Sequence, residues 1–502
     1  MQYQLLARRC INFLGSKLFF AITVLVFFIE AAWIALSARY PQAFDEQFHL
    51  GIIQLYAHQW SPFFSHQVAN ADQYGAVTRD PSYLYHYLMS FPWRLITHLT
   101  GSFTTQVIVM RFLNIGLLGS SLFIFRKVLA LAPASKALIN TSLFLFVLTP
   151  VVPLLGSQIN YDNMIIPLTG LAVLWCVQLV QQIKHRKLAL TSILRLLALC
   201  LFASLVKYAY LPIFAAVFLI VFVYAWRAAR TKHLQIIRTS KAKLITLGTF
   251  VVIGIGLFTA CYGVNMLRYH TPTPECDQVL SIQQCEAYAP WARNYDLVQH
   301  KVMPPLWQIA LYPLDWLYHS MGELIFSIGS AFDASGGVEY YVGAQTIVIE
   351  VLAWTIFGIG LGLSLYYAKY LWRNEVLRIF IIISGLYALA LWVQNVGDYL
   401  HTGQPLAIHG RYLLPILPLV YGMVALLFRK LLQVRQVLPR VGAPTRNVAL
   451  TAVVFALLIT QGGGVLTFII RSDPRWFWPQ SSQVQTVNAN AKKLLDPMVF
   501  GD

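Results

Sequence analysis

Long apolar stretches alternate with short polar segments along most of the chain. Each stretch has roughly the 20 residues that an α-helix needs to cross the hydrocarbon core of a bilayer, and about eleven such stretches are present. They lie near 18–38, 107–125, 137–153, 163–182, 189–206, 208–226, 244–264, 344–368, 378–396, 412–428 and 448–470. The pattern predicts an all-α polytopic membrane protein, with one transmembrane domain over 1–470 and a short tail over 471–502.

Two longer polar segments, 39–106 and 265–343, interrupt this alternation. In the first, the spacing of apolar residues predicts a helix from Glu46 to about Tyr56, with Asp45 as its N-cap. Further along, the sequence DPSYLYHYLMSFPWRLI predicts a second helix that begins with a capping aspartate and a first-turn proline. Aromatic side chains favour the headgroup region, so we expect two interfacial helices in this segment.

The second long segment contains an apolar run around 305–331 that has almost the length of a further span. A span here would turn every later basic loop to the opposite side of the membrane, so we interpret the run as an interfacial or re-entrant helix. Asp315, His319 and Glu323 recur at a spacing of four and therefore share one helical face. That face is either the wet side of an interfacial helix or a metal or substrate site.

The composition agrees with a membrane protein, because 58% of the residues are apolar and only 11% are charged. A soluble protein of this length would be about a quarter charged. The net charge of +17 is unevenly placed, since alternate polar segments hold most of the lysines and arginines and almost no acids. This positive-inside pattern predicts a cytoplasmic amino terminus and an extracytoplasmic carboxyl terminus in the plasma (inner) membrane. The excess charge attracts anionic lipid headgroups, and we expect no nucleic-acid partner.

Cys276 and Cys285 lie together in the second long segment, on the side predicted to be extracytoplasmic. They form a local disulfide if that compartment is oxidising, and otherwise remain two free thiols. The other cysteines fall in or beside apolar stretches and are expected to be small packing residues. The chain contains no Cys-x-x-Cys or zinc-type His/Cys spacing.

An acidic pair, Asp45 and Glu46, follows the first apolar stretch directly, and His49 lies one helical turn after Asp45. Ionisable groups at the edge of a bilayer are costly to place. A helix cap explains one acid and not two. The pair is therefore the first candidate for chemistry, with partial desolvation expected to raise the proton affinity of Asp45.

Other polar residues gather at the same predicted side of the membrane. The short turn that contains Tyr161 and Asp162 either satisfies helix ends, with Asp162 as a cap, or lines an outward cavity. Lys207, which precedes Tyr208, either snorkels to the surface or binds a phosphate.

Arg411 and Tyr412 lie where a later span enters the membrane, away from the basic cytoplasmic belt. An arginine in this position needs an anionic partner. That partner is either an internal acid such as Asp398 or a ligand phosphate, which a guanidinium binds through two parallel hydrogen bonds.

Five short stretches occur together in a recognisable order: FDEQFH, DPSYLYHYL, SQINYDN, LVKYAYLP and HGRYLLPILP. In this order the chain from about 40 to 420 resembles an uncharacterised family of bacterial multi-pass proteins within the GT-C glycosyltransferase superfamily. The resemblance implies a GT-C-like bundle, a polyprenyl-phosphate-linked sugar as donor, and an essential acid in the first external loop. By position that acid is Asp45, with Glu46 as the alternate, and Lys207 and Arg411 are donor-phosphate contacts.

The sequence thus predicts a membrane glycosyltransferase that moves a hexosyl or pentosyl group to an extracytoplasmic lipid, cell-surface glycan or protein. The expected substrate-binding residues are His49, Tyr161, Asp162, Lys207, Tyr208, Arg411 and Tyr412. No metal ligands are assigned, although Asp45 or Glu46 leave a divalent metal as an option. The alternatives are a flippase or transporter of lipid-linked saccharides, which should show repeat symmetry and broken helices, and a polysaccharide ligase.

Overall fold

The computed structural model describes residues 2–42, 45–231, 235–237, 240–326, 330–332, 338–340, 347–434, 468–469, 476–478 and 482–500. Each apolar stretch expected from the sequence, up to 412–428, coincides with a helix. The stretch 448–470 lies outside the described residues except for 468–469. The matching helices are α2 (Lys17–Ser37), α5 (Phe103–Leu129), α6 (Lys136–Leu148), α8 (Asp162–Lys184), α9 (Leu190–Val206), α10 (Leu211–Thr231), α11 (Lys241–Phe258), α17 (Ile347–Tyr366), α19 (Glu375–Thr402) and α20 (Leu417–Val434).

Among the described residues, six helical segments are long and apolar enough to cross a membrane. They are Lys17–Ser37, Phe103–Leu129, Asp162–Lys184, Tyr208–Arg230, Lys241–Tyr269 and Glu375–Thr402. Shorter helices extend or connect them: α1 (Gln2–Leu14), α7 (Val151–Gly156), η2 (Tyr208–Tyr210), η3 (Thr259–Gly263), α12 (Val264–Tyr269), α18 (Ala368–Arg373) and η4 (Gly410–Leu413). The helical, multi-pass membrane architecture predicted from the sequence is confirmed.

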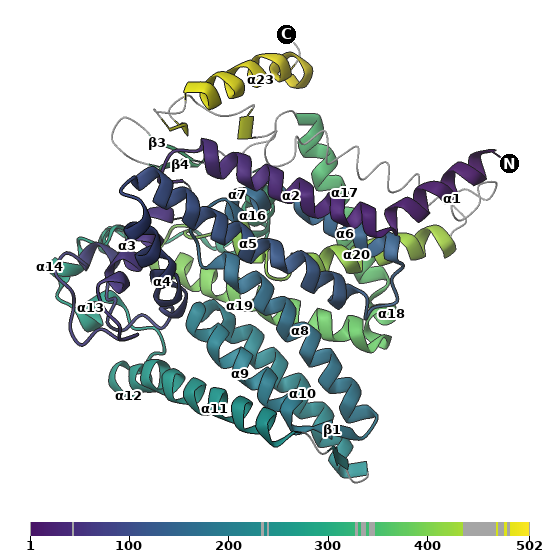
Figure 1. Ribbon diagram of the computed structural model, residues 1–502, viewed down its shortest axis with the longest axis horizontal. Helices are drawn as coiled ribbons and strands as arrows, with labels where there is room; N and C mark the ends of the chain where they lie inside the picture. The colour runs from purple at the N-terminus through teal and green to yellow at the C-terminus, as the bar shows by residue number, and fades with distance from the viewer. Residues whose placement is uncertain are drawn as a thin grey trace.

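Serine caps fix where several of these helices begin. Ser16, Ser102 and Ser135 precede α2, α5 and α6, and each side-chain oxygen accepts a hydrogen bond from a backbone N–H three residues later. Such caps satisfy donors that the first helical turn would otherwise leave unpaired. In the bundle, α8 packs against α5, α9 and α10, while α11 and α12 lie at one edge (Figure 1).

Two helices form in the loop between α2 and α5, as expected: α3 (Glu46–Ala57) and α4 (Leu84–Leu99), with the turn η1 (Asp72–Tyr74) between them. Arg94 of α4 donates to the carbonyls of Ala57 at 2.9 Å and Tyr56 at 2.7 Å, and so closes the carboxyl end of α3. The predicted start of α4 is wrong. Asp80 accepts from the Ser82 N–H at 2.8 Å in a separate turn, and the helix begins at Leu84.

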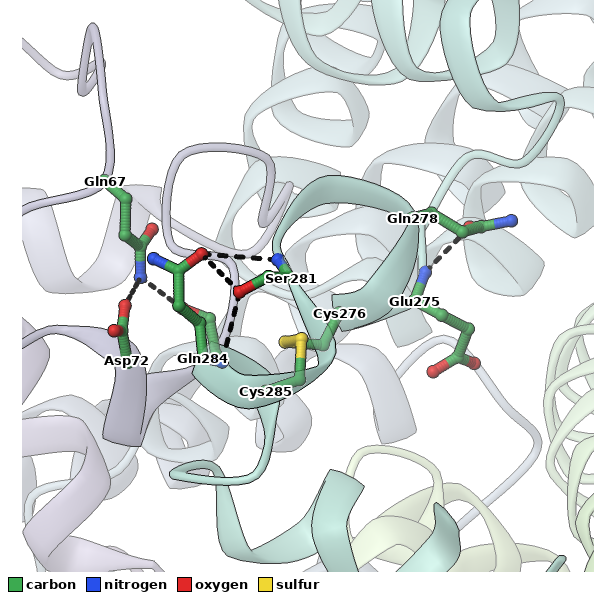
Figure 2. Close-up of a disulfide and its surroundings, with 9 residues drawn as sticks. Gln67, Asp72, Glu275, Cys276, Gln278, Ser281, Gln284 and Cys285 are labelled. Carbon is green, nitrogen blue, oxygen red and sulfur yellow. Dashed lines mark hydrogen bonds between the residues drawn. A yellow bond between two sulfur atoms is a disulfide. The ribbon is translucent and has the colours of Figure 1, made fainter.

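The second long loop contains α13 (Cys276–Val279), α14 (Ile282–Cys285), α15 (Ala289–Gln299) and α16 (Leu306–Phe326). Cys276 and Cys285 form a disulfide (Figure 2). The two cysteines belong to a small buried cluster with Trp291. Ser281 and Gln284 exchange hydrogen bonds beside it in a capping box. Of the two states left open by the sequence, the structure therefore contains the disulfide.

Helix α16 covers most of the apolar run around 305–331, whose interpretation as an interfacial or re-entrant helix stays a prediction. Asp315 and His319 pair at 3.2 Å on an exposed part of the helix. Glu323 does not join them, because its carboxylate accepts from His409 and from the backbone N–H of Gly410. The three residues therefore do not form one metal site.

Two short sheets were not predicted. Strands β1 (Lys187–Ala189) and β2 (Gln235–Ile237) run parallel and join the α8–α9 turn to the α10–α11 turn. Strands β3 (Ser330–Phe332) and β4 (Val338–Tyr340) are antiparallel, with Ala331 opposite Glu339.

Part of the carboxyl-terminal tail is folded against α2. The Arg39 N–H donates to the Trp476 carbonyl at 2.6 Å, and the Trp478 N–H donates to the Ser37 carbonyl at 3.2 Å. The last helix, α23 (Ser482–Phe500), lies over the same end of α2 (Figure 1). Trp33 reaches it and donates to the Asn488 side chain at 3.0 Å.

Candidate active site

The candidate site lies where the start of α3, the start of α8, the end of α9 and η4 meet. Nη2 of Arg411 is 2.7 Å from Oδ2 of Asp45. Nζ of Lys207 is 2.6 Å from Oδ1 of Asp162. Residues from four separate parts of the chain thus form two neighbouring ion pairs.

Aromatic rings connect the two pairs. Nζ of Lys207 lies 4.4 Å from the ring centre of Tyr161 and 4.5 Å from that of Tyr412. The Tyr412 hydroxyl is 3.4 Å from Nη2 of Arg411. A cation over a ring face is attracted by its quadrupole, which holds the ammonium group in place. The two cations therefore share Tyr412 and belong to one site.

Asp45 occupies the N-cap position of α3 but does not cap it. Its backbone is left-handed, with φ 66° and ψ 28°, and its side chain makes no capping hydrogen bond. The carboxylate turns to Arg411 instead, and 54% of the Asp45 side chain is exposed. The cap interpretation is therefore wrong for the side chain, and Asp45 is the accessible acid of the site.

The surroundings of Asp45 set its acidity. Burial favours the neutral form, but the charge and hydrogen bond of Arg411, together with the charges of His409 and Lys207, outweigh it and hold the pKa of the Asp45 carboxyl below its ordinary value. The expected rise in proton affinity is therefore wrong for the protein as it stands. Asp45 is a carboxylate at neutral pH.

Contacts with helix α16 position η4, and with it Arg411, beside the Asp45 carboxylate. Glu323 accepts hydrogen bonds from the backbone of Gly410 and, at 2.8 Å, from the His409 ring. A Cβ atom at Gly410 would clash with backbone atoms of Ser320 and Leu324, so only glycine allows η4 to lie this close to α16. Arg411 itself is 4% exposed. Of the two alternatives left open by the sequence, the structure contains an internal acid, and that acid is Asp45 and not Asp398.

Lys207 is held in an extended residue between α9 and η2, with φ −154° and ψ 128°. It is only 5% exposed, so the snorkelling interpretation is wrong. Asp162 is the first residue of α8 and its own N–H donates to the Asn160 side chain at 2.9 Å. Asp162 is therefore not the cap of α8, and its carboxylate pairs with Lys207 instead.

Tyr208 turns away from the ion pairs. Its hydroxyl accepts from the Gln394 side chain of α19 at 3.1 Å, and its backbone N–H donates to the Ser82 hydroxyl at 3.0 Å. Its contacts tie η2 to α19 and to the segment before α4. Of the expected substrate-binding residues, Tyr208 is the one whose side-chain contacts lie outside the cluster.

Glu46 is separated from the site by complete burial. Its two oxygens accept from Nε and Nη2 of Arg111 at 2.8 and 2.7 Å, from the Gln42 N–H at 2.7 Å and from the Ile159 N–H at 3.2 Å. Arg111 also donates to the carbonyl of Ala38 at the end of α2. These contacts occupy both Glu46 oxygens, whereas the Asp45 side chain is accessible.

Sequence reasoning missed Arg111 and His86. Arg111 lies inside the apolar stretch of α5, where an arginine requires an anionic partner. This position was the signal that could have identified it. His86 of α4 lies 2.9 Å from Nδ1 of His49, which in turn has its ring centre 4.4 Å from that of Tyr161. No sequence pattern connects the two histidines.

Within the described ranges, no group of three His, Cys, Asp or Glu side chains is arranged to hold a metal ion. The described residues therefore provide no set of three such ligands for a divalent metal at Asp45 or Glu46. The charges at the site are instead balanced by the side chains themselves, two cations against two carboxylates.

No family model and no curated protein matches the chain. Its fold is similar to solved structures of an oligosaccharyltransferase from Archaeoglobus fulgidus tethered to an acceptor peptide (TM-score 0.42, 14% identity) and of the same organism's AglB with an inhibitory peptide and dolichol-phosphate (0.42, 13%). It is also similar to ArnT from Cupriavidus metallidurans bound to undecaprenyl phosphate (0.40, 12%). The alignments cover 95, 94 and 96% of this chain but 55, 55 and 77% of those chains. The chain thus spans about half the length of the first two.

Proposed function

We propose that this protein is a membrane glycosyltransferase of the GT-C type, which moves a sugar from a polyprenyl-phosphate donor to an extracytoplasmic acceptor. The observation that carries the proposal is the meeting of one accessible carboxylate, Asp45, with two buried cations, Arg411 and Lys207, at the ends of membrane helices. The order of short motifs in the sequence supports the same assignment. The side of the membrane follows from the placement of basic residues.

The cations suit a lipid-linked phosphate. The guanidinium of Arg411 offers a planar fork that matches phosphate oxygens, and Lys207 adds a point charge beside it. Each cation about 4 Å from a phosphate contributes roughly 4 kcal/mol at an effective dielectric near 20, before desolvation costs. The prenyl chain would lie against the apolar helices that surround these residues.

Donor binding changes the charge balance. In the free protein the two cations are matched by Asp45 and Asp162, so a donor phosphate competes with Asp45 for Arg411. The released carboxylate loses its cation and gains an anionic neighbour, and both changes raise its pKa. Asp45 thereby becomes a stronger base only when the donor is present.

The reaction then follows from these positions. The acceptor oxygen attacks the anomeric carbon while its proton passes to the Asp45 carboxylate. The bond between that carbon and the phosphate oxygen breaks, and the polyprenyl phosphate leaves with the electron pair, stabilised by Arg411 and Lys207. Attack opposite the leaving group inverts the configuration of the sugar. Asp45 later returns its proton to water.

The proposal predicts that kcat and kcat/KM fall at different pH values on the acidic side of the pH–rate profile. Transfer requires ionised Asp45, whose pKa in the free enzyme lies below its ordinary value. The acidic half-point of kcat/KM should therefore lie below the ordinary pKa of an aspartate, about 3.9. In the donor complex the pKa is higher, so kcat should begin to fall at a higher pH than kcat/KM. The pH–rate profiles of the purified enzyme measure both half-points. Coincident half-points, or the reverse order, would contradict competition for Arg411.

The test of the function uses the full chain in liposomes that contain radiolabelled polyprenyl-phosphate monosaccharides, with cell-envelope lipids and glycans as acceptors. We expect label to leave the carrier and appear in an acceptor. If the protein is a flippase, the labelled donor crosses the bilayer intact. If it is a ligase, only preassembled polysaccharide is transferred. Either result would overturn the proposal.

A further inference from the structure

Two histidines from α3 and α4 face each other beside the candidate site, and the proposed reaction uses neither. His49 is 2% exposed and His86 is completely buried. Nδ1 of His49 lies 2.9 Å from Nε2 of His86, and the rings are stacked with centres 5.2 Å apart. Burying two polar rings is costly unless their nitrogens are paired, so the position of each proton matters.

A backbone carbonyl fixes the first proton. Nδ1 of His86 is 3.2 Å from the carbonyl oxygen of Ser82, one turn earlier in the chain. A carbonyl oxygen accepts hydrogen bonds and cannot donate, so the proton must be on Nδ1 of His86. In a neutral ring the other nitrogen, Nε2, then carries a lone pair and must accept from Nδ1 of His49.

Both rings are neutral near pH 7. Burial lowers the pKa of His86 to about 3, against a smaller opposing effect of the Ser82 carbonyl. Burial, His86 and the charges of Arg411 and Lys207 hold the pKa of His49 well below its ordinary value. The rings packed around His49 belong to Phe48, Tyr85, Tyr161 and His86. With both rings neutral, the proton of His49 is on Nδ1 and its Nε2 carries a lone pair.

The His49 ring lies close enough to Arg411 and Lys207 for both charges to act on it. Nε2 is on the far side of the ring from Nδ1, and therefore points away from His86. The His49 ring meets Tyr161 edge to face, and that same ring carries the Lys207 ammonium 4.4 Å from its centre. Among the described residues, Nε2 of His49 makes no hydrogen bond.

We infer that Nε2 of His49 accepts a hydrogen bond from a hydroxyl of the sugar on the donor, and that His86 is the positioning residue that holds His49 in this tautomer. The inference rests on the proposed function. The sugar is directly bonded to the phosphate, so its hydroxyls lie within reach of residues that flank the two cations. A neutral acceptor suits this place because a further carboxylate would repel the phosphate.

The test compares His86→Leu, which removes the acceptor for Nδ1 of His49, with His86→Gln, whose side-chain oxygen can replace it. The proton on His49 is located by nitrogen NMR of histidine-labelled protein in detergent, with the His49 signal assigned by its loss in His49→Gln. We expect the proton on Nδ1 in the wild type and in His86→Gln, and a mixture of tautomers in His86→Leu. The exposed His58 and His98 provide control substitutions to glutamine.

The second readout is kcat/KM of the wild type and of each variant, measured with the donor that the wild type transfers. Loss of one hydrogen bond, worth about 0.5–1.5 kcal/mol, should make His86→Leu and His49→Leu lower kcat/KM about two- to twelvefold, with His86→Gln close to wild type. A proton on Nε2 of wild-type His49, or equal kinetics of His86→Leu and His86→Gln, would overturn the inference. The tautomer is measured without donor, so a wild type that transfers no sugar overturns the proposed function and leaves the tautomer result standing.

Discussion

Asp45→Asn is expected to lower the rate of sugar transfer by about 10²- to 10⁴-fold while the protein still inserts and folds. Asparagine keeps the size of the side chain but cannot take the proton of the acceptor hydroxyl. Arg411 is only 4% exposed, so loss of the Asp45 charge leaves a buried guanidinium without its counterion and should lower the free energy of unfolding by up to about 3–5 kcal/mol, less what the amide oxygen recovers as an acceptor. The measurement is the initial rate of transfer in liposomes loaded with donor lipid.

The matched control is Asp296→Asn. Asp296 is exposed, lies in α15 and pairs with His300 at the surface of that helix, so its substitution should leave transfer unchanged. Thermal unfolding of each variant in detergent shows that the fold is kept. Transfer by Asp45→Asn at the wild-type rate would end the assignment of Asp45 as the base.

Glu46→Gln and Arg111→Met should each lower the free energy of unfolding by about 3–5 kcal/mol. Both side chains are completely buried and bonded through two parallel hydrogen bonds, so removal of either charge leaves the other uncompensated. Arg111 also holds the end of α2, so the loss should be greater than for one ordinary hydrogen bond. Unfolding temperature and denaturant midpoint in detergent report the change.

The Lys184–Glu375 pair supplies the control for this prediction. Its distance, 2.6 Å, is close to the 2.7 Å of Glu46 and Arg111, but the lysine side chain is 56% exposed, so Lys184→Gln should cost at most about 1 kcal/mol. The double variant Glu46→Gln/Arg111→Met should lose less stability than the sum of the single variants, because no uncompensated charge remains. A Glu46→Gln variant as stable as the wild type would show that the buried pair is not needed for the fold.

Much of the fold could be predicted because the bilayer imposes simple patterns on the sequence. A membrane helix must satisfy its own backbone and present apolar side chains, so its length and position are visible as apolar runs. The helix after Asp45 was predicted in the same way, from its amphipathic spacing. The short strands β1 and β2 were not predicted, since three residues give no periodicity that distinguishes a strand from a turn.

The pairing of charges could not be predicted. The sequence indicated that Arg411 needs an anionic partner and offered phosphate binding as one option for Lys207. It did not show which acids pair with them, because Asp45 precedes Arg411 by 366 positions and Asp162 precedes Lys207 by 45. Hydropathy places a residue at a membrane face and says nothing about its neighbours on that face. For the same reason the acid pair could not be divided in advance into an accessible Asp45 and a buried Glu46.

The central claim is that Arg411 and Lys207 hold a polyprenyl phosphate beside Asp45, and binding of the carrier lipid tests it most directly. Native mass spectrometry of the full chain with a short-chain polyprenyl phosphate, compared with the matching polyprenol, measures the contribution of the phosphate. We predict that the phosphate binds more tightly than the alcohol, that Arg411→Gln and Lys207→Gln each weaken its binding about tenfold or more, and that substitution of the exposed Arg293 by glutamine does not. Equal binding of the phosphate and the alcohol, or undiminished phosphate binding by Arg411→Gln, would contradict the claim.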